Sequence, residues 1–260
     1  MPGTDLALLI DAVRSSGEIA KQFTGADAQR WDKPGDAGPV TEADLAVNAH
    51  LLDVLRTARP DYGWLSEETE DNSDRQQCDM VFIVDPIDGT RSFIEGSKTW
   101  AHSIAIAQDG IVVAGAVYLP MRNMLYAAEL GGGATLNGAA LAASKAGDLD
   151  RSEILSATPN MRAQFWQGAI PAFKRAYRPS LAYRMALIAE GRFDGMITFR
   201  PTWEWDIAAG ALIASEAGAT VTDRTGAPLR FNNSDPRTHG IVSAAPLVHS
   251  AIIKRHIADA

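Results

Sequence analysis

Apolar residues recur three and four positions apart in two segments near the start of the chain. The first segment spans residues 6–20, and the second spans residues 45–55, which Pro60 follows. Residues at this spacing lie on one face of an α-helix, so we expect two amphipathic helices. Between them, residues 32–39 read Asp-Lys-Pro-Gly-Asp-Ala-Gly-Pro. This polar stretch is rich in glycine and proline, which predicts a mobile loop.

Short apolar runs with β-branched residues predict strands in the rest of the chain. Residues 80–84 are wholly apolar, as in a strand that is buried on both faces. Three runs between residues 103 and 128 predict an antiparallel meander, and Asn137-Gly138 marks a hairpin turn. Further strands are expected near residues 154–157, 195–199, 220–222 and 240–244, with helices over residues 181–190, 206–217 and through Ile252. Interleaved helices and strands predict a layered α/β (α+β) sandwich.

Composition and charge narrow the class of protein. The 260 residues are 46% hydrophobic, which is enough for a buried core in one compact unit. A formal net charge of −8 argues against long nucleic acids, because clustered Lys and Arg bind phosphate backbones. Cys78 is the only cysteine, which excludes an intrachain disulfide and a cysteine zinc site. Neither a signal peptide nor an apolar run of ~20 residues is present, so we expect a cytoplasmic protein with no membrane partner.

Carboxylates stand beside structure-ending signals at four places. Each place has an ordinary structural explanation, such as a helix cap, a first-turn acid or a tight turn. The four segments are Thr41-Glu42-Ala43-Asp44, Ser66-Glu67-Glu68, Asp85-Pro86-Ile87-Asp88-Gly89-Thr90 and Trp203-Glu204-Trp205-Asp206. Taken singly, most of them do not establish a site.

The third segment is the hardest to explain by structure alone. Asp85 and Asp88 follow a buried strand at its carboxyl end, where open α/β sheets place ligands. Two unit charges ~4 Å apart repel by about 4 kcal/mol at an effective dielectric of about 20, so the pair needs protonation, separation or a cation. Oxygen ligands favour Mg²⁺ or a similar hard cation, and Pro86 stiffens a turn that aims both carboxylates and the Ile87 carbonyl at one point. The spacing differs from that of an EF-hand calcium loop.

Gly89 and Thr90 predict a phosphate-binding turn beside this cluster. Glycine lets the backbone approach a ligand closely, and Thr90 offers an amide and a hydroxyl at the start of a short helix. Two metal ions would polarise a phosphoryl group and activate a bound water, so no protein nucleophile is required. By contrast, residues 131–133, Gly-Gly-Gly, precede a hairpin signal and lack the Lys-Ser or Lys-Thr pair of a P-loop.

In this order, the segments resemble the inositol monophosphatase superfamily of lithium-sensitive, magnesium-dependent phosphatases. The resemblance spans roughly residues 33–223. It is carried by Asp85-Pro86-Ile87-Asp88-Gly89-Thr90 and by Trp205-Asp206-Ile207-Ala208-Ala209. The resemblance implies a Mg²⁺-dependent enzyme with two or three ions per site.

The resemblance also assigns roles to single residues. One ion would be held by Glu67, Asp85 and the Ile87 carbonyl, and a second by Asp85, Asp88 and Asp206. Glu67 would help to hold a third, weaker ion through water, near Lys33. Thr90 and its partner Asp44, together with Glu67, would activate or orient the attacking water. The amides of Gly89 and Thr90, beside Asp88, would bind phosphate.

The implied fold is a five-layered αβαβα sandwich of the inositol monophosphatase and fructose-1,6-bisphosphatase type, in a homodimer. Residues 1–145 would form an N-terminal α+β lobe that carries most of the metal ligands. Residues 146–260 would form a C-terminal α/β lobe that supplies Asp206 and the specificity residues. Gly38 stands where inositol-specific members often carry an aspartate, so the shell of the third ion departs from the family pattern.

The segment before Asp206 is expected to set substrate choice. Phe199 stands in the place of a glutamate that contacts inositol hydroxyls, and Trp203 would edge the pocket. Residues 180–191 with Pro201-Thr202 are closer to the 3'(2'),5'-bisphosphate nucleotidase branch.

Arg184 or Arg200 would then contact a second phosphate, since a guanidinium forks well onto phosphate. Both are equally explained as surface ion-pair residues.

The sequence therefore predicts hydrolysis of a phosphate monoester on a small phosphorylated metabolite. A bisphosphorylated adenosine and an inositol monophosphate are the leading substrates, and histidinol phosphate is the third. A catalytically silent phosphate- or metal-binding regulator on the same fold is an alternative, but it would need no water-activating pair. A purely structural assembly protein predicts tolerance of Asp88→Asn in all assays.

Overall fold

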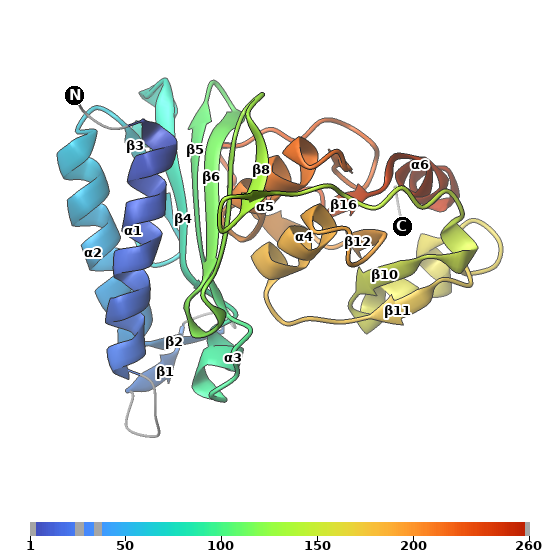
Figure 1. The fold of residues 1–260 in the computed structure, drawn as a ribbon, viewed down its shortest axis with the longest axis horizontal. Helices are drawn as coiled ribbons and strands as arrows, with labels where there is room; N and C mark the ends of the chain where they lie inside the picture. Colours follow the sequence, from blue (N-terminus) through green and yellow to red (C-terminus); the bar gives the residue numbers. More distant parts are fainter. Residues whose placement is uncertain (1–3, 24–28, 34–37, 258–260) are drawn as a thin grey trace.

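The computed structural model describes residues 4–23, 29–33 and 38–257, and its elements stack in five layers (Figure 1). Helices α1 (Asp5–Ala20) and α2 (Glu42–Ala58) cover one face of a seven-stranded sheet. Helices α4 (Leu181–Ala189) and α5 (Glu204–Glu216) lie between that sheet and a five-stranded sheet. Helix α6 (Pro246–Arg255) covers the outer face of the second sheet. The predicted αβαβα sandwich is confirmed.

The seven-stranded sheet has the order β3-β4-β5-β6-β7-β8-β9. β3 pairs with β4 in parallel, and the other neighbouring pairs are antiparallel. Its strands are β3 (Gly63–Ser66), β4 (Met80–Asp88), β5 (Ala101–Gln108), β6 (Ile111–Leu119), β7 (Met124–Glu129), β8 (Gly133–Leu136) and β9 (Ala139–Ala140). Asn137 and Gly138 turn the chain between β8 and β9 with φ angles of 50° and 84°, which suit these two residue types. The predicted meander and hairpin are both confirmed.

The five-stranded sheet has the order β11-β10-β12-β16-β14. β10 is parallel to β11 and β12, and β16 is antiparallel to β12 and β14. Its strands are β10 (Glu153–Ser156), β11 (Lys174–Ala176), β12 (Gly195–Thr198), β14 (Thr220–Thr222) and β16 (Ile241–Ala244). Two further antiparallel pairs are β1 (Arg30–Asp32) with β2 (Pro39–Thr41), and β13 (Thr202–Trp203) with β15 (Arg237–Thr238).

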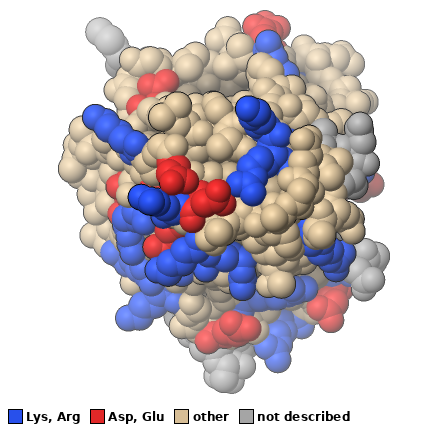
Figure 2. Space-filling model, turned by 90° about the vertical axis from the view of Figure 1, so that its right-hand side faces the viewer, with Lys and Arg blue, Asp and Glu red and all other residues tan. Residues whose placement is uncertain are grey.

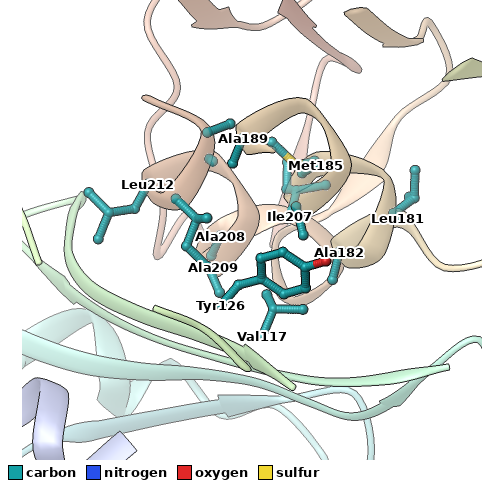
Figure 3. Close-up of a cluster of buried hydrophobic side chains, with 14 of the residues drawn as sticks. Val117, Tyr126, Leu181, Ala182, Met185, Ala189, Ile207, Ala208, Ala209 and Leu212 are labelled. Atoms are coloured by element: carbon teal, nitrogen blue, oxygen red, sulfur yellow. The ribbon is translucent and has the colours of Figure 1, made fainter. Parts of the chain in front are cut away.

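The largest core lies between the seven-stranded sheet and the helices α4 and α5 (Figure 3). α4 is buried on all sides, as expected of a helix enclosed between two sheets. Glycines allow close approach here: a Cβ on Gly115 of β6 would lie 3.0 Å from the Cα of Ala209 in α5. A Cβ on Gly210 of α5 would lie 2.7 Å from the Cβ of Met185 in α4. This packing sets the position of α5 against the sheet.

Two segments differ from the predicted pattern. β4 continues four residues beyond its predicted end at residue 84, and its pairing with β5 shifts register between Asp85 and Asp88. The strand therefore bulges where a turn was expected, and the short helix α3 (Thr90–Ile94) follows it. In the expected loop, Asp32 ends β1 and Pro39 begins β2, while residues 34–37 lie outside the described residues.

The excess of acidic over basic residues lies in the first part of the chain. Residues 1–145 contain 11 Lys and Arg against 21 Asp and Glu, whereas residues 146–260 contain 13 against 11. Figure 2 shows Lys and Arg side chains gathered on the face at the right of Figure 1. The net charge of −8 therefore does not by itself exclude an anionic partner at this face. Among the described residues, no helix has both the length and the apolar character needed to cross a membrane.

Candidate metal and phosphate site

Three carboxylates from two distant segments meet beside the end of β4. Asp85 and Asp88 lie in the last residues of β4, and Asp206 lies in the first turn of α5. One carboxylate oxygen of each lies within 4.8 Å of those of the other two. Asp85 and Asp88 are 1% and 7% exposed, and Asp206 is half-buried. The fold thus brings together three of the predicted metal ligands, which we call the acidic triad.

Asp88 is held by the start of α4, whereas one oxygen of Asp85 has no such support. Oδ2 of Asp88 accepts hydrogen bonds from the Ser180 hydroxyl and from the Ala182 amide, both at 2.6 Å. Ser180 also caps α4 by accepting from the Tyr183 amide at 2.9 Å. Oδ1 of Asp85 is buried and has no hydrogen-bond partner among the described residues. A buried, unpartnered oxygen between other carboxylates fits a cation ligand.

Burial raises the pKa of all three triad carboxyls, and neighbouring carboxylates raise the pKa values of Asp85 and Asp206 further. Desolvation is the largest cause for Asp85, and the charges of Glu67, Asp88 and Asp206 raise its pKa further. Desolvation also comes first for Asp206, followed by the charges of Asp88 and Glu67. The pKa of Asp88 is raised to about 6 by desolvation, although its hydrogen bonds oppose the change. A hard divalent cation would relieve this repulsion, and the oxygen-only donor set fits Mg²⁺.

Glu67 approaches the triad from the end of β3, together with Lys33 and Glu68. The Glu67 amide donates to the Val84 carbonyl at 3.2 Å, which continues the pairing of β3 with β4. Nζ of Lys33 lies 2.8 Å from Oε1 of Glu67 and 2.6 Å from Oε1 of Glu68. Desolvation would lower the pKa of Lys33, but these two carboxylates raise it overall. The ammonium group of Lys33 therefore neutralises a predicted metal ligand in this structure.

Thr90 and Asp44 lie side by side. Oγ1 of Thr90 lies 3.3 Å from Oδ1 of Asp44 and 3.2 Å from the Ile87 carbonyl oxygen. The other oxygen of Asp44 accepts from the amide and the hydroxyl of Thr41 at 2.8 Å and 2.5 Å, which completes a capping box for α2. Burial raises the pKa of Asp44 to about 6, against the lowering effect of Thr41. Asp44 thus caps a helix and contacts Thr90 at the same time.

The backbone turns sharply between β4 and α3. Gly89 has φ 96° and ψ 41°, in the left-handed region that a residue with a Cβ adopts only at a cost. This turn places Thr90 at the first position of α3, where its hydroxyl reaches back to the Ile87 carbonyl. The predicted phosphate-binding residues Gly89 and Thr90 therefore follow directly on the triad residue Asp88.

Known proteins resemble the chain along almost its whole length. The profile of the inositol monophosphatase family matches residues 4–259. The chain belongs to the inositol monophosphatase family. Nus factor SuhB of Escherichia coli K12 is 33% identical over 259 residues, covering 95% of this chain and 94% of that protein. Inositol-1-monophosphatase of Rhizobium meliloti is 32% identical over 237 residues, covering 85% of this chain and 86% of that protein. The solved structure of an IMPase from Thermotoga maritima has a TM-score of 0.81 and 28% identity, covering 96% of this chain and 95% of that chain.

Phe199 corrects one expectation about substrate selection within this family. Its ring is 0% exposed and stacks on His256, with ring centroids 3.9 Å apart. It belongs to a core that includes Trp166 and residues of β16 and α6. The side chain therefore offers no surface to a substrate, because it fills this core instead of lining a pocket.

Two arginines bring positive charge to the triad. Arg184 is 5% exposed, and its guanidinium lies 4.5 Å from the centre of the Tyr177 ring. Its charge opposes the rise that desolvation causes in the pKa of Asp88, and the charge of the exposed Arg200 opposes the rise in the pKa of Asp206. Among the residues with described positions, neither arginine forms an ion pair, so the surface ion-pair explanation does not apply.

Trp203 presents an aromatic surface at the N-terminus of α5. It is 39% exposed and lies three residues before Asp206. Its ring stacks on Trp205 at a centroid distance of 4.7 Å and an interplanar angle of 8°. The guanidinium of Arg237 lies 5.2 Å from the centre of the Trp203 ring.

Sequence reasoning missed the contributions of Ser180 and Glu68. Ser180 stands immediately before a helical run, which is an N-cap signal, but its bond to Asp88 joins residues 92 positions apart. Glu68 shares Lys33 with Glu67, and desolvation raises its pKa to about 7. The adjacent pair of glutamates was visible in the sequence, but no local pattern indicates which of the two is buried.

Proposed function

We propose that this chain is a divalent-cation-dependent phosphomonoesterase that hydrolyses a small phosphorylated metabolite with water as the nucleophile. The acidic triad of Asp85, Asp88 and Asp206 carries the proposal, because these repelling acids need a cation to be charged together. The contact between Thr90 and Asp44 supports catalysis over simple metal storage, since storage needs no group to orient water.

The residues that would hold Mg²⁺ are those of the triad, Glu67 and the Ile87 carbonyl. When bound, the metal supplies polarisation of the phosphoryl group and a lowered pKa for a coordinated water. Asp44 accepts the hydrogen bond of the Thr90 hydroxyl, so that a lone pair of Thr90 Oγ1 is available to accept a hydrogen bond from the attacking water. The amides of Gly89 and Thr90 would bind the phosphate oxygens. Lys33 occupies Oε1 of Glu67, which leaves Oε2 to bind a metal.

For the substrate, we propose 3'(2')-phosphoadenosine 5'-phosphate ahead of inositol monophosphate. Arg200 is exposed, acts electrostatically on Asp206 and lacks a carboxylate partner among the described residues, which suits a second phosphate. Arg184 adds a second positive charge nearby, and Trp203 exposes an aromatic surface that a base would contact. Histidinol phosphate is the third candidate.

A phosphate-release panel tests both the metal-dependent activity and the choice of substrate. Adenosine 3',5'-bisphosphate, inositol 1-phosphate, histidinol phosphate and fructose 1,6-bisphosphate are each assayed with Mg²⁺ and with EDTA. We expect release only with Mg²⁺, with the highest kcat/KM for the adenosine compound. Arg200→Ala is expected to raise KM for this substrate and not for inositol 1-phosphate, while the control Arg192→Ala changes neither. Absence of release from all four compounds would overturn the enzymatic proposal.

A non-catalytic regulator is the second candidate. Several relatives carry the name Nus factor SuhB, and the face in Figure 2 is rich in Lys and Arg. A chain that binds Mg²⁺ but releases no phosphate from any compound of the panel would favour this candidate.

A further inference from the structure

We infer that Glu204 is a positioning residue that fixes Asp206 against Asp85 and Asp88. The inference rests on the proposed function, because it concerns the same metal site. Three like-charged carboxylates within 4.8 Å repel one another, so the surrounding chain must restrain them. Asp206 lies on α5 and the other two lie on β4, so an effective restraint has to join these two elements.

The Glu204 carboxylate clamps the first turn of α5. It is 0% exposed, and three donors satisfy it. Oε2 accepts from the Asn232 amide at 2.6 Å, and Oε1 accepts from the Asn233 amide at 2.9 Å and from Nδ2 of Asn233 at 2.6 Å. The Glu204 amide donates to the Pro236 carbonyl at 2.9 Å. Residues 232–236 therefore hold α5 by hydrogen bonds at Glu204, two residues before Asp206.

Arg75 links this segment to the stretch of chain that leads into β4, the strand that carries the other two ligands. It is 2% exposed and lies in a short 3₁₀ helix just before β4. Its guanidinium donates to Oδ1 of Asn232 at 2.5 Å and to the Asn233 carbonyl at 2.8 Å. It also donates to both carboxylate oxygens of Asp71, at 2.7 Å and 2.8 Å. Nδ2 of Asn232 returns a bond to the Arg75 carbonyl at 3.2 Å. A continuous path of hydrogen bonds thus joins the 3₁₀ helix that precedes β4 to the start of α5.

A buried charged network is an inefficient way to stabilise a fold. A protein in which apolar residues of similar volume replace a buried ion pair is often as stable or more stable, because the cost of desolvating the charges offsets their attraction. Asn232 also adopts φ 62°, which is uncommon for a residue other than glycine. The network instead fixes an orientation. The backbone amides of two successive residues and one side-chain amide hold the Glu204 carboxylate in a single position.

A hydrogen bond from β5 restrains the same turn of α5. The Ser103 hydroxyl of β5 donates to the Trp205 carbonyl at 3.1 Å. Loss of Glu204 is therefore expected to make the position of Asp206 less well defined, while Asp206 stays near the other two carboxylates. Weakened metal binding, with the metal-binding site still present, is the expected signature.

The test compares metal affinity with stability in the full chain. Mg²⁺ and Mn²⁺ are titrated by calorimetry into the wild type, Glu204→Ala and Glu204→Gln, and thermal unfolding is recorded in EDTA. Glu190→Gln is the control, because Glu190 is a part-buried carboxylate bonded to the Tyr126 hydroxyl on another part of the molecule. We expect Glu204→Ala to weaken Mg²⁺ binding about 10- to 100-fold, as removal of an outer ligand support does. Glu204→Gln keeps one acceptor oxygen and is expected to lose less, and Glu190→Gln is expected to bind as the wild type does.

The outcomes separate the inference from the proposed function. If the Glu204 variants bind Mg²⁺ as tightly as the wild type while their Tm falls, Glu204 is only structural and the inference is overturned. If Glu204→Ala does not fold, Glu204→Gln decides by the same criterion. If the wild type binds neither Mg²⁺ nor Mn²⁺, the proposed function itself fails, which is a different result from equal binding by wild type and variant.

Discussion

Neutralising one triad carboxylate is expected to stabilise the metal-free protein and to remove most of its response to metal. In Asp85→Asn, the charge that faces both Asp88 and Asp206 is lost with little change in shape. Two unit charges 4.8 Å apart repel by about 3.5 kcal/mol at an effective dielectric of about 20. Desolvation raises the pKa of Asp88 from 3.8 to about 6, so protonation of Asp88 relieves this repulsion only as the pH approaches 6. We expect the variant to gain about 1–3 kcal/mol, or roughly 2–10 °C in Tm.

The sign of the effect depends on pH. The folded-state pKa values of the triad are raised, first by desolvation and for Asp85 and Asp206 also by repulsion, so the ionised triad destabilises the fold at pH values above them. As the pH falls, the folded carboxyls take up protons before the unfolded ones do, and the repulsion disappears. The advantage of Asp85→Asn is therefore expected near neutral pH. It is expected to shrink between about pH 6 and pH 4, the interval between the folded pKa of Asp88 and its ordinary value of 3.8.

Thermal unfolding with EDTA and with excess Mg²⁺ measures both effects. The wild type is expected to gain about 2.7 kcal/mol when Mg²⁺ is a hundredfold above its Kd, and Asp85→Asn much less. Asp79→Asn is the control, since it removes an exposed carboxylate just before β4. The reasoning is refuted if Asp85→Asn is less stable than the wild type in EDTA, or if Mg²⁺ stabilises both equally.

Three further substitutions test separate features. Thr90→Ala is expected to lower kcat about 100-fold while the Mg²⁺ affinity measured by calorimetry stays within about twofold; an unchanged kcat would contradict the role of this hydroxyl. Phe199→Ala is expected to cost about 3–5 kcal/mol in urea unfolding with KM unchanged at low temperature, whereas a selective rise in KM without loss of stability would show that the ring meets substrate. Gly115→Ala places a Cβ 3.0 Å from the Ala209 backbone and is expected to cost about 1–3 kcal/mol, against little change for Gly147→Ala, and equal urea midpoints would contradict this packing.

Elements with long or local signals were predictable from the sequence. The helices over residues 5–20 and 42–58 follow the apolar periodicity, and the hairpin at Asn137-Gly138 follows its turn residues. β4 was predicted too short, because Asp85 ends its apolar run. The neighbouring strand β5 nevertheless continues the pairing to Asp88, opposite Ala101. Strands such as β1 and β3 have only three or four residues, which is too few for a period to appear.

The candidate site was predictable only in part. Asp85 and Asp88 form a local motif, and their placement beside Asp206 came from the resemblance to a family and not from spacing. Phe199 shows the limit of such transfer: position along the chain does not determine whether a side chain faces a pocket or a core. Ser180 shows another limit, because a capping signal is local while its bond to Asp88 depends on how two distant segments pack.

The division of the acidic triad between two distant segments has a consequence for biosynthesis. Asp206 follows Asp88 by 118 residues, so a growing polypeptide displays the first two acids long before the third leaves the ribosome. Any structure that the nascent N-terminal half forms at that stage lacks the third ligand, since folding begins in the order of translation. Cation binding would thus stabilise the finished molecule and would not start its folding. Chains truncated before residue 206 would bind cellular Mg²⁺ weakly.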